Sequence, residues 1–169
     1  YSLMDENQIG RIVDIISEKK RIYVYGKGSS GLAALEMKLR FMRIGVTIEA
    51  ITDVDIMKMN SVLLDGECAA IGISVSGRTE AVIHSLQSAK KCGAAVILMT
   101  SHIEKKFQNF CDEIMLFAVK ANLEKGKAIS PQFPILVMVD IIYSRMLRMD
   151  DFRRETLHEY TLEVLERDS

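Results

Sequence analysis

Five short runs of apolar residues alternate along this chain with longer segments of helical periodicity. Strands are expected at residues 21–26, 46–51, 68–73, 94–99 and 113–117. Short apolar strands separated by helices are typical of a parallel sheet that is covered on both faces. Right-handed crossovers then predict a three-layer αβα sandwich around a doubly wound, five-stranded parallel sheet. The predicted fold class is α/β.

The segments before, between and after these strands predict seven helices. They are expected at 2–20, 32–43, 53–64, 80–92, 103–110, 132–148 and 151–166, with a polar loop at 121–130. One apolar face of the second helix is formed by Leu32, Leu35, Leu39 and Met42. One face of the last helix is formed by Leu157, Tyr160, Val164 and Leu165. The helix at 132–148 is apolar nearly all round, so we expect it to be packed on both sides.

A turn rich in hydroxyl groups, Ser74 to Glu80, follows the third predicted strand and precedes a helix. Ser74, Ser76 and Thr79 can donate to an anion, and Gly77 lets the backbone approach closely. The N–H groups and the dipole at a helix start favour an anion there. Helix capping is the alternative, but capping accounts for one hydroxyl, not three. The turn therefore predicts a phosphate-binding loop.

A second turn of similar composition, Gly26 to Gly31, follows the first predicted strand. The commonest order of a five-stranded sheet places strands one and three side by side, so one small ligand could touch both turns. The glycines also suggest a dinucleotide fingerprint, with Asp53 as a ribose partner. However, the third glycine comes one place early, so we expect no nicotinamide cofactor. A nucleoside triphosphatase is excluded because no Walker lysine follows.

Composition and charge further limit the classes of function that this chain can have. The 169 residues fit one domain. A net charge of −1 gives no sign of the basic surface that nucleic-acid-binding domains carry. The three cysteines lack metal-ligand spacing and suggest free thiols in the cytoplasm. No secretory signal is recognisable, and the longest apolar run, 133–139, is too short to span a membrane.

The two turns together resemble the SIS (sugar isomerase) domain. The matching residues are Gly26-x-Gly28-x-Ser30 and Ser74-x-Ser76-Gly77-x-Thr79. This resemblance implies the sandwich fold and a phosphosugar ligand. Carried across by position, it implies that the phosphate is held by Ser74, Ser76 and Thr79 and by the N–H groups of Val75 and Gly77. It further implies that Ser29 and Ser30 reach the ligand from the first turn, and that Thr100 and Ser101 meet sugar hydroxyls.

Within that family, the finer pattern is similar to the effector domain of RpiR-type transcriptional regulators. It is carried by residues 26–34, 39–45 and 139–143. The resemblance implies a sensor of a sugar phosphate whose DNA contact belongs to an N-terminal helix-turn-helix domain. Because the chain begins at Tyr1 and not at Met, we expect that domain to precede residues 1–169. A homodimer through the last two helices is also expected.

An aldose–ketose isomerase is the alternative function, and it would need a base beside the sugar. The resemblance implies a glutamate near the start of the long helix in such enzymes. Here Gln132 stands in that region, and no acidic residue lies between Gly126 and Val139. His102 is the remaining candidate base, while Glu80 is explained by the helix dipole. We therefore predict no catalytic residue, no metal and no cofactor.

Overall fold

The computed structural model describes residues 5–118, 132–149 and 153–167. The strands are β1 (Arg21–Tyr25), β2 (Ile48–Ile51), β3 (Cys68–Ile73), β4 (Ala95–Thr100) and β5 (Glu113–Leu116). The helices are α1 (Glu6–Glu18), α2 (Ser29–Met42), α3 (Val54–Ser61), α4 (Glu80–Lys91), the 3₁₀ helix η1 (Lys105–Asn109), α6 (Gln132–Leu147) and α7 (Arg153–Arg167). The predicted loop at 121–130 and the predicted start of the last helix at Asp151 lie outside the described residues.

All five strands are parallel, and their order in the sheet is β2-β1-β3-β4-β5. This arrangement confirms the predicted doubly wound sheet with β1 beside β3. Since parallel strands all end at the same edge, the loops that follow β1, β3 and β4 lie next to one another. The topology therefore brings together three segments that are far apart in the sequence.

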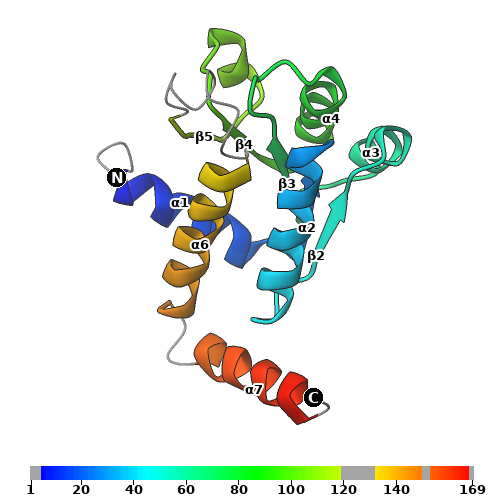
Figure 1. Ribbon diagram of the computed structural model, residues 1–169. Helices are drawn as coiled ribbons and strands as arrows, with labels where there is room; N and C mark the ends of the chain where they lie inside the picture. Colours follow the sequence, from blue (N-terminus) through cyan, green and yellow to red (C-terminus); the bar gives the residue numbers. More distant parts are fainter. Residues whose placement is uncertain (1–4, 119–131, 150–152, 168–169) are drawn as a thin grey trace.

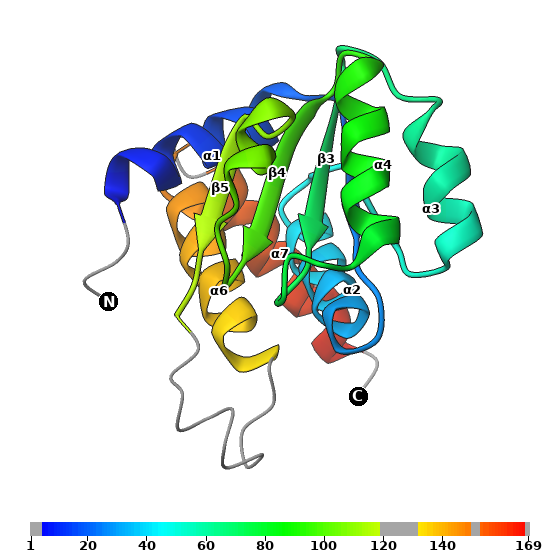
Figure 2. The ribbon, with the colours of Figure 1, turned by 90° about the horizontal axis from the view of Figure 1, so that it is seen from above.

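Two apolar clusters cover the two faces of the sheet and complete the three-layer sandwich (Figures 1 and 2). Helices α1, α2 and α6 form one cluster with Ala69, Ile71 and Ile73 of β3. Helices α3 and α4 form the other with Cys68 and Ala70 of the same strand. Side chains along a strand alternate between faces, so β3 supplies both clusters and is buried throughout.

Helix α2 differs from its prediction in its start and in its buried face. It begins at Ser29 rather than at residue 32, because Gly28 adopts a φ of 60° and its carbonyl accepts from Leu32 N at 3.2 Å. The predicted apolar face is not part of the core. The residues that pack on the sheet are Ala33, Ala34, Met37 and Phe41, whereas Leu32, Leu35, Leu39 and Met42 are exposed.

Helix α7 lies across the ends of α2 and α6, apart from the sandwich (Figure 1). His158 Nδ1 lies 2.5 Å from the hydroxyl of Tyr143 on α6, and Thr161 Oγ1 accepts from Arg43 Nε at 3.4 Å. None of the residues described for α7 is buried. The helix is therefore attached to the domain by a few polar contacts and by Leu157, whose side chain lies next to Gly45.

Candidate functional site

The turn after β1 is shaped by glycines that no larger residue can replace. A Cβ on Gly26 would lie 2.5 Å from the carbonyl oxygen of Ser30, so the strand can meet the start of α2 this closely only through glycine. Gly28 has the positive φ that the turn requires. As a result, Ser29 and Ser30 occupy the first turn of α2, where backbone N–H groups lack partners within the helix.

The turn after β3 runs from Ser74 to Thr79 and leads into α4. Gly77 closes it with a φ of 70°, and its N–H donates to the carbonyl of Ser74 at 3.1 Å. A Cβ at this glycine would also lie 3.1 Å from the ring of Phe107. Both the conformation and the close packing explain why this position carries glycine.

Ser74 is buried under this turn and holds Thr79 in place. Its Oγ donates to Thr79 Oγ1 at 2.9 Å and accepts from Thr79 N at 3.4 Å. Only 1% of Ser74 is exposed, so its hydroxyl faces the loop and not solvent. Because Ser74 supplies the proton of this pair, the proton of the Thr79 hydroxyl stays available for another acceptor.

Ser76 is exposed at the tip of the same turn. Its Oγ accepts from the backbone N–H of Arg78 at 3.1 Å, which fixes the direction of the side chain. A hydroxyl that accepts one hydrogen bond still has its own proton to donate. Ser76 and Thr79 therefore present two orientated donors on one loop.

The end of β4 fastens this loop to the sheet. The carbonyl of Val75 accepts from Ser101 N at 3.0 Å and from Ser101 Oγ at 2.6 Å. Ser101 Oγ also lies 2.9 Å from His102 Nδ1. Thr100 is fully buried, and its hydroxyl donates to the same carbonyl of Val75 at 3.3 Å. Thr100 thus supports the loop from inside the protein, while Ser101 and His102 lie nearer the surface.

A cavity of about 350 Å³ opens where the three loops meet. It is lined by Lys27, Ser29, Ser30, Val75, Ser76, Thr79, Ser101 and His102. Both predicted turns therefore face one cavity at the carboxyl edge of the sheet. Among the residues predicted to bind the ligand, Ser74, Gly77 and Thr100 are not part of this lining.

The cavity has the electrostatic character of an anion site. The starts of α2 and α4 both contribute to its wall, and each carries the positive end of a helix dipole. Lys27 adds a full positive charge. In the part of the chain that the structure describes, no carboxylate lines this cavity.

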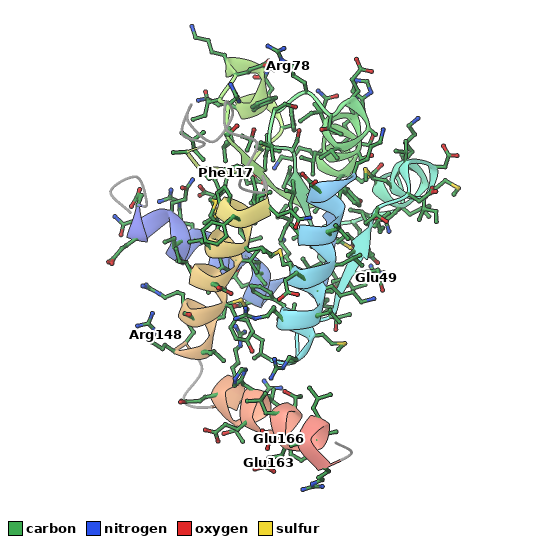
Figure 3. All side chains as sticks on the ribbon, viewed as in Figure 1. Glu49, Arg78, Phe117, Arg148, Glu163 and Glu166 are labelled. Atoms are coloured by element: carbon green, nitrogen blue, oxygen red, sulfur yellow. The ribbon has the colours of Figure 1, made fainter. Side chains whose placement is uncertain are left out.

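A neighbouring hollow lies on the other side of the Gly77 turn. Arg78, Glu80, His84, Glu104 and Lys106 line it, so its charges are mixed. Figure 3 shows Arg78 at the outer margin of the molecule. Glu80, which was considered from the sequence, thus lies beside the anion cavity and not in it, together with Arg78 and His84.

The remaining candidates have structural partners. Asp53, which was considered as a ribose partner, caps α3 by accepting from Ile56 N at 3.0 Å. Gln132, at the start of α6, donates to the carbonyl of Ser29 at 2.9 Å and so lies next to the first turn. His158 contacts Tyr143, far from the cavity. Within the described ranges, no group of three His, Cys, Asp or Glu side chains could hold a metal ion.

Lys27 is the residue of the cavity that the sequence analysis missed. It stands between Gly26 and Gly28, in a turn whose glycines and serines carry the predicted motif. A cation inside a glycine-rich turn is compatible with phosphate binding, so its position was a usable signal.

The sequence model of the SIS domain matches residues 15–138. The chain belongs to the SIS domain family. Its known relatives include regulators: it is 25% identical over 149 residues to the HTH-type transcriptional regulator RpiR of Escherichia coli, covering 88% of this chain and 50% of that protein. It spans about half the length of the curated regulators it matches.

The SIS fold is also recognised in solved structures. The NanR protein of Vibrio vulnificus, solved in complex with ManNAc-6P, superimposes with a TM-score of 0.88 at 22% identity, covering 99% of this chain and 63% of that one. An enzyme is similar as well: 3-hexulose-6-phosphate isomerase of Mycobacterium gastri is 25% identical over 130 residues, which is 77% of this SIS domain and 63% of the enzyme. None of the described helices is long and apolar enough to cross a membrane.

Proposed function

We propose that this chain is the sugar-phosphate-binding sensor domain of a transcriptional regulator of carbohydrate metabolism. In this proposal the phosphate lies between the two Ser/Gly turns, and DNA is bound by a helix-turn-helix domain elsewhere in a longer cytoplasmic protein. The observation that supports it best is the single cavity that both turns line. The similarity to regulators about twice as long supports the assignment of DNA binding to a part of the protein outside this chain.

The proposed contacts follow from the donors around the cavity. Ser76 and Thr79 would donate to the phosphate with their hydroxyls, and Ser29 and Ser30 would approach from the start of α2. The N–H group of Val75 completes the proposed set. The Gly77 N–H is not included, because it donates to the carbonyl of Ser74. Lys27 would balance the charge of the dianion.

Ser74 has a different proposed role. Because it is buried and bonded to Thr79, it would orientate the Thr79 hydroxyl without touching the ligand. Ser101 and His102, which line the same cavity from the end of β4, would meet the hydroxyls of the sugar.

A thermal-shift screen tests the proposal. Sugar phosphates, ManNAc-6P among them, are compared with the corresponding unphosphorylated sugars. A ligand at 100 times its Kd stabilises a protein by about 2.7 kcal/mol, which for a chain of this size raises Tm by roughly 5–10 °C. We expect such a rise for at least one sugar phosphate and none for the unphosphorylated sugars. Equal shifts for both classes, or no shift at all, would contradict the proposal.

Isomerase activity is the second candidate, and the similarity to 3-hexulose-6-phosphate isomerase favours testing it. A proton must move between adjacent carbons, yet the described lining offers His102 as its one imidazole and no carboxylate. We expect no conversion of hexulose 6-phosphate by the wild-type protein. Turnover that disappears in His102→Ala, with ligand binding retained, would show that the domain is an enzyme.

A further inference from the structure

Ser101 and His102 form a hydrogen-bonded pair at the end of β4, on the wall of the cavity. The Oγ of Ser101 lies 2.6 Å from the carbonyl oxygen of Val75 and 2.9 Å from Nδ1 of His102. The backbone N–H of Ser101 donates to the same carbonyl at 3.0 Å, so two contacts hold this serine to the loop after β3. These contacts determine which atom of the pair carries each proton.

The hydroxyl proton of Ser101 is used by Val75. A carbonyl oxygen has no proton to give, so the hydroxyl must be the donor across the 2.6 Å contact. Because a hydroxyl has only one proton, the Oγ of Ser101 can only accept in its contact with His102. Nδ1 of His102 therefore carries a proton and donates it to Ser101, since two lone pairs would repel each other at 2.9 Å.

This hydrogen bond selects the tautomer of neutral His102. A neutral imidazole has a single N–H, and the hydrogen bond of one ring nitrogen decides the state of the other. With the proton on Nδ1, the Nε2 atom has a lone pair and no hydrogen. His102 thus brings an acceptor to a lining whose other described polar side chains, apart from Ser101, each have a proton to donate: Lys27, Ser29, Ser30, Ser76 and Thr79.

We propose that Ser101 is a positioning residue that holds neutral His102 in the Nδ1–H tautomer, and that Nε2 of His102 accepts a hydrogen bond from a hydroxyl of the bound sugar. This inference rests on the proposed function and narrows the class of ligand. The phosphate would use the donors of the two turns, whereas Nε2 selects a group that has a proton to give. A ligand that offers only a carbonyl oxygen or a fluorine at that place would be rejected, because two acceptors would face each other.

The two other histidines of the chain serve as controls. His158 has the opposite arrangement, because its Nδ1 lies 2.5 Å from the hydroxyl of Tyr143, which can donate. Neutral His158 should therefore carry its proton on Nε2. His84 is exposed on α4 and lines the neighbouring hollow instead of the cavity. Replacing each histidine in turn assigns the three sets of ring signals.

The tautomer is tested by two-bond proton–nitrogen correlation spectra of the whole chain without ligand, at pH 8.5, where an ordinary histidine is neutral. We expect His102 as the Nδ1–H form and His158 as the Nε2–H form. Ser101→Ala should shift His102 toward a mixture of tautomers, and Ser101→Thr, which keeps the hydroxyl, should preserve the wild-type spectrum. A wild-type His102 that is mainly Nε2–H, or a spectrum unchanged by Ser101→Ala, would overturn the proposal.

The acceptor role is tested by titration calorimetry at the same pH. The probes are glucose 6-phosphate, fructose 6-phosphate and glucosamine 6-phosphate, with inorganic phosphate for comparison. His102→Phe should reduce the preference for the best of these sugar phosphates over inorganic phosphate at least fivefold, while His84→Phe should leave it as in the wild type. An unchanged preference in His102→Phe would refute the acceptor role alone. Failure of every sugar phosphate to bind would instead refute the proposed function, and the ring spectra would still decide the tautomer.

Discussion

Ser74 and Ser76 stand two residues apart on one loop, yet their environments differ completely. Ser74 is buried and bonded to Thr79, whereas Ser76 is exposed at the rim of the cavity. Substituting each with alanine should therefore separate binding from stability. The comparison is informative because both changes remove one hydroxyl from the same turn.

Ser76→Ala should weaken sugar-phosphate binding by about 1–3 kcal/mol, because it removes a donor to a charged acceptor. The Tm of the free protein should stay unchanged, since Ser76 is exposed. Isothermal titration with the best ligand of the screen measures the affinity. Wild-type affinity in this variant would count against the proposed phosphate contact.

Ser74→Ala should lower the stability of the free protein by about 1–2 kcal/mol, because it removes the buried hydroxyl that is bonded to half-buried Thr79. In a chain of this size the Tm should fall by roughly 2–8 °C. Differential scanning calorimetry without ligand measures it. A Tm equal to that of the wild type would show that the Ser74–Thr79 hydrogen bond is not a significant stabilising contact.

Lys27→Met should reduce affinity for sugar phosphates, since it removes the one cation that lines the described cavity. We expect a loss of about 1–3 kcal/mol that becomes smaller at high salt. Lys58→Met is the control, because Lys58 is also exposed but belongs to α3. An equal effect of the two substitutions would show that only the net charge of the protein matters.

The sequence predicted most of the cavity residues because hydroxyls and glycines gather at strand ends in a recognisable pattern. Ser29, Ser30, Ser76 and Thr79 are examples. The sequence could not predict that Ser74 is buried, since its N–H bonds to the carbonyl of Met99 and its hydroxyl to Thr79 only in the folded chain. The three hydroxyls of one motif are equivalent in sequence, and only packing distinguishes them.

At the scale of elements, periodicity predicted that α2 is amphipathic but suggested the wrong buried side. The side that packs on the sheet carries Ala33 and Ala34, because close approach of helix and sheet needs small residues. The larger leucines occupy the opposite face. Hydrophobicity alone cannot distinguish a core from an interface, since both exclude water.

Helix α7 should detach as the pH falls. The pKa of His158 is lowered because docking removes water from the imidazole and because Arg43 and Arg40 repel its charged form, an effect that Glu159 and Glu155 oppose. The docked state therefore favours neutral His158, whose Nδ1 can accept from the Tyr143 hydroxyl. The undocked state binds the additional proton, so the docking free energy decreases as the pH falls below about 6.5.

Hydrogen exchange of the α7 amides, corrected for the intrinsic effect of pH, measures this detachment. Protection at pH 5.5 should be lower than at pH 7.5. His158→Gln should show little dependence on pH, while His84→Gln, altered on α4, should behave like the wild type. Unchanged protection of the wild type across this range would contradict the role of His158.

At the scale of the whole molecule, the strand order determines when the cavity can form. Its walls follow β1, β3 and β4, and β1 reaches β3 only after the chain between them has folded back. A ribosome-bound chain that stops before residue 101 lacks one wall altogether. Such non-local pairings form late and slowly, so a nascent chain should be unable to capture the metabolite until nearly the whole sheet has assembled. Recovery of ligand binding during refolding would accordingly report the last step of folding rather than the first.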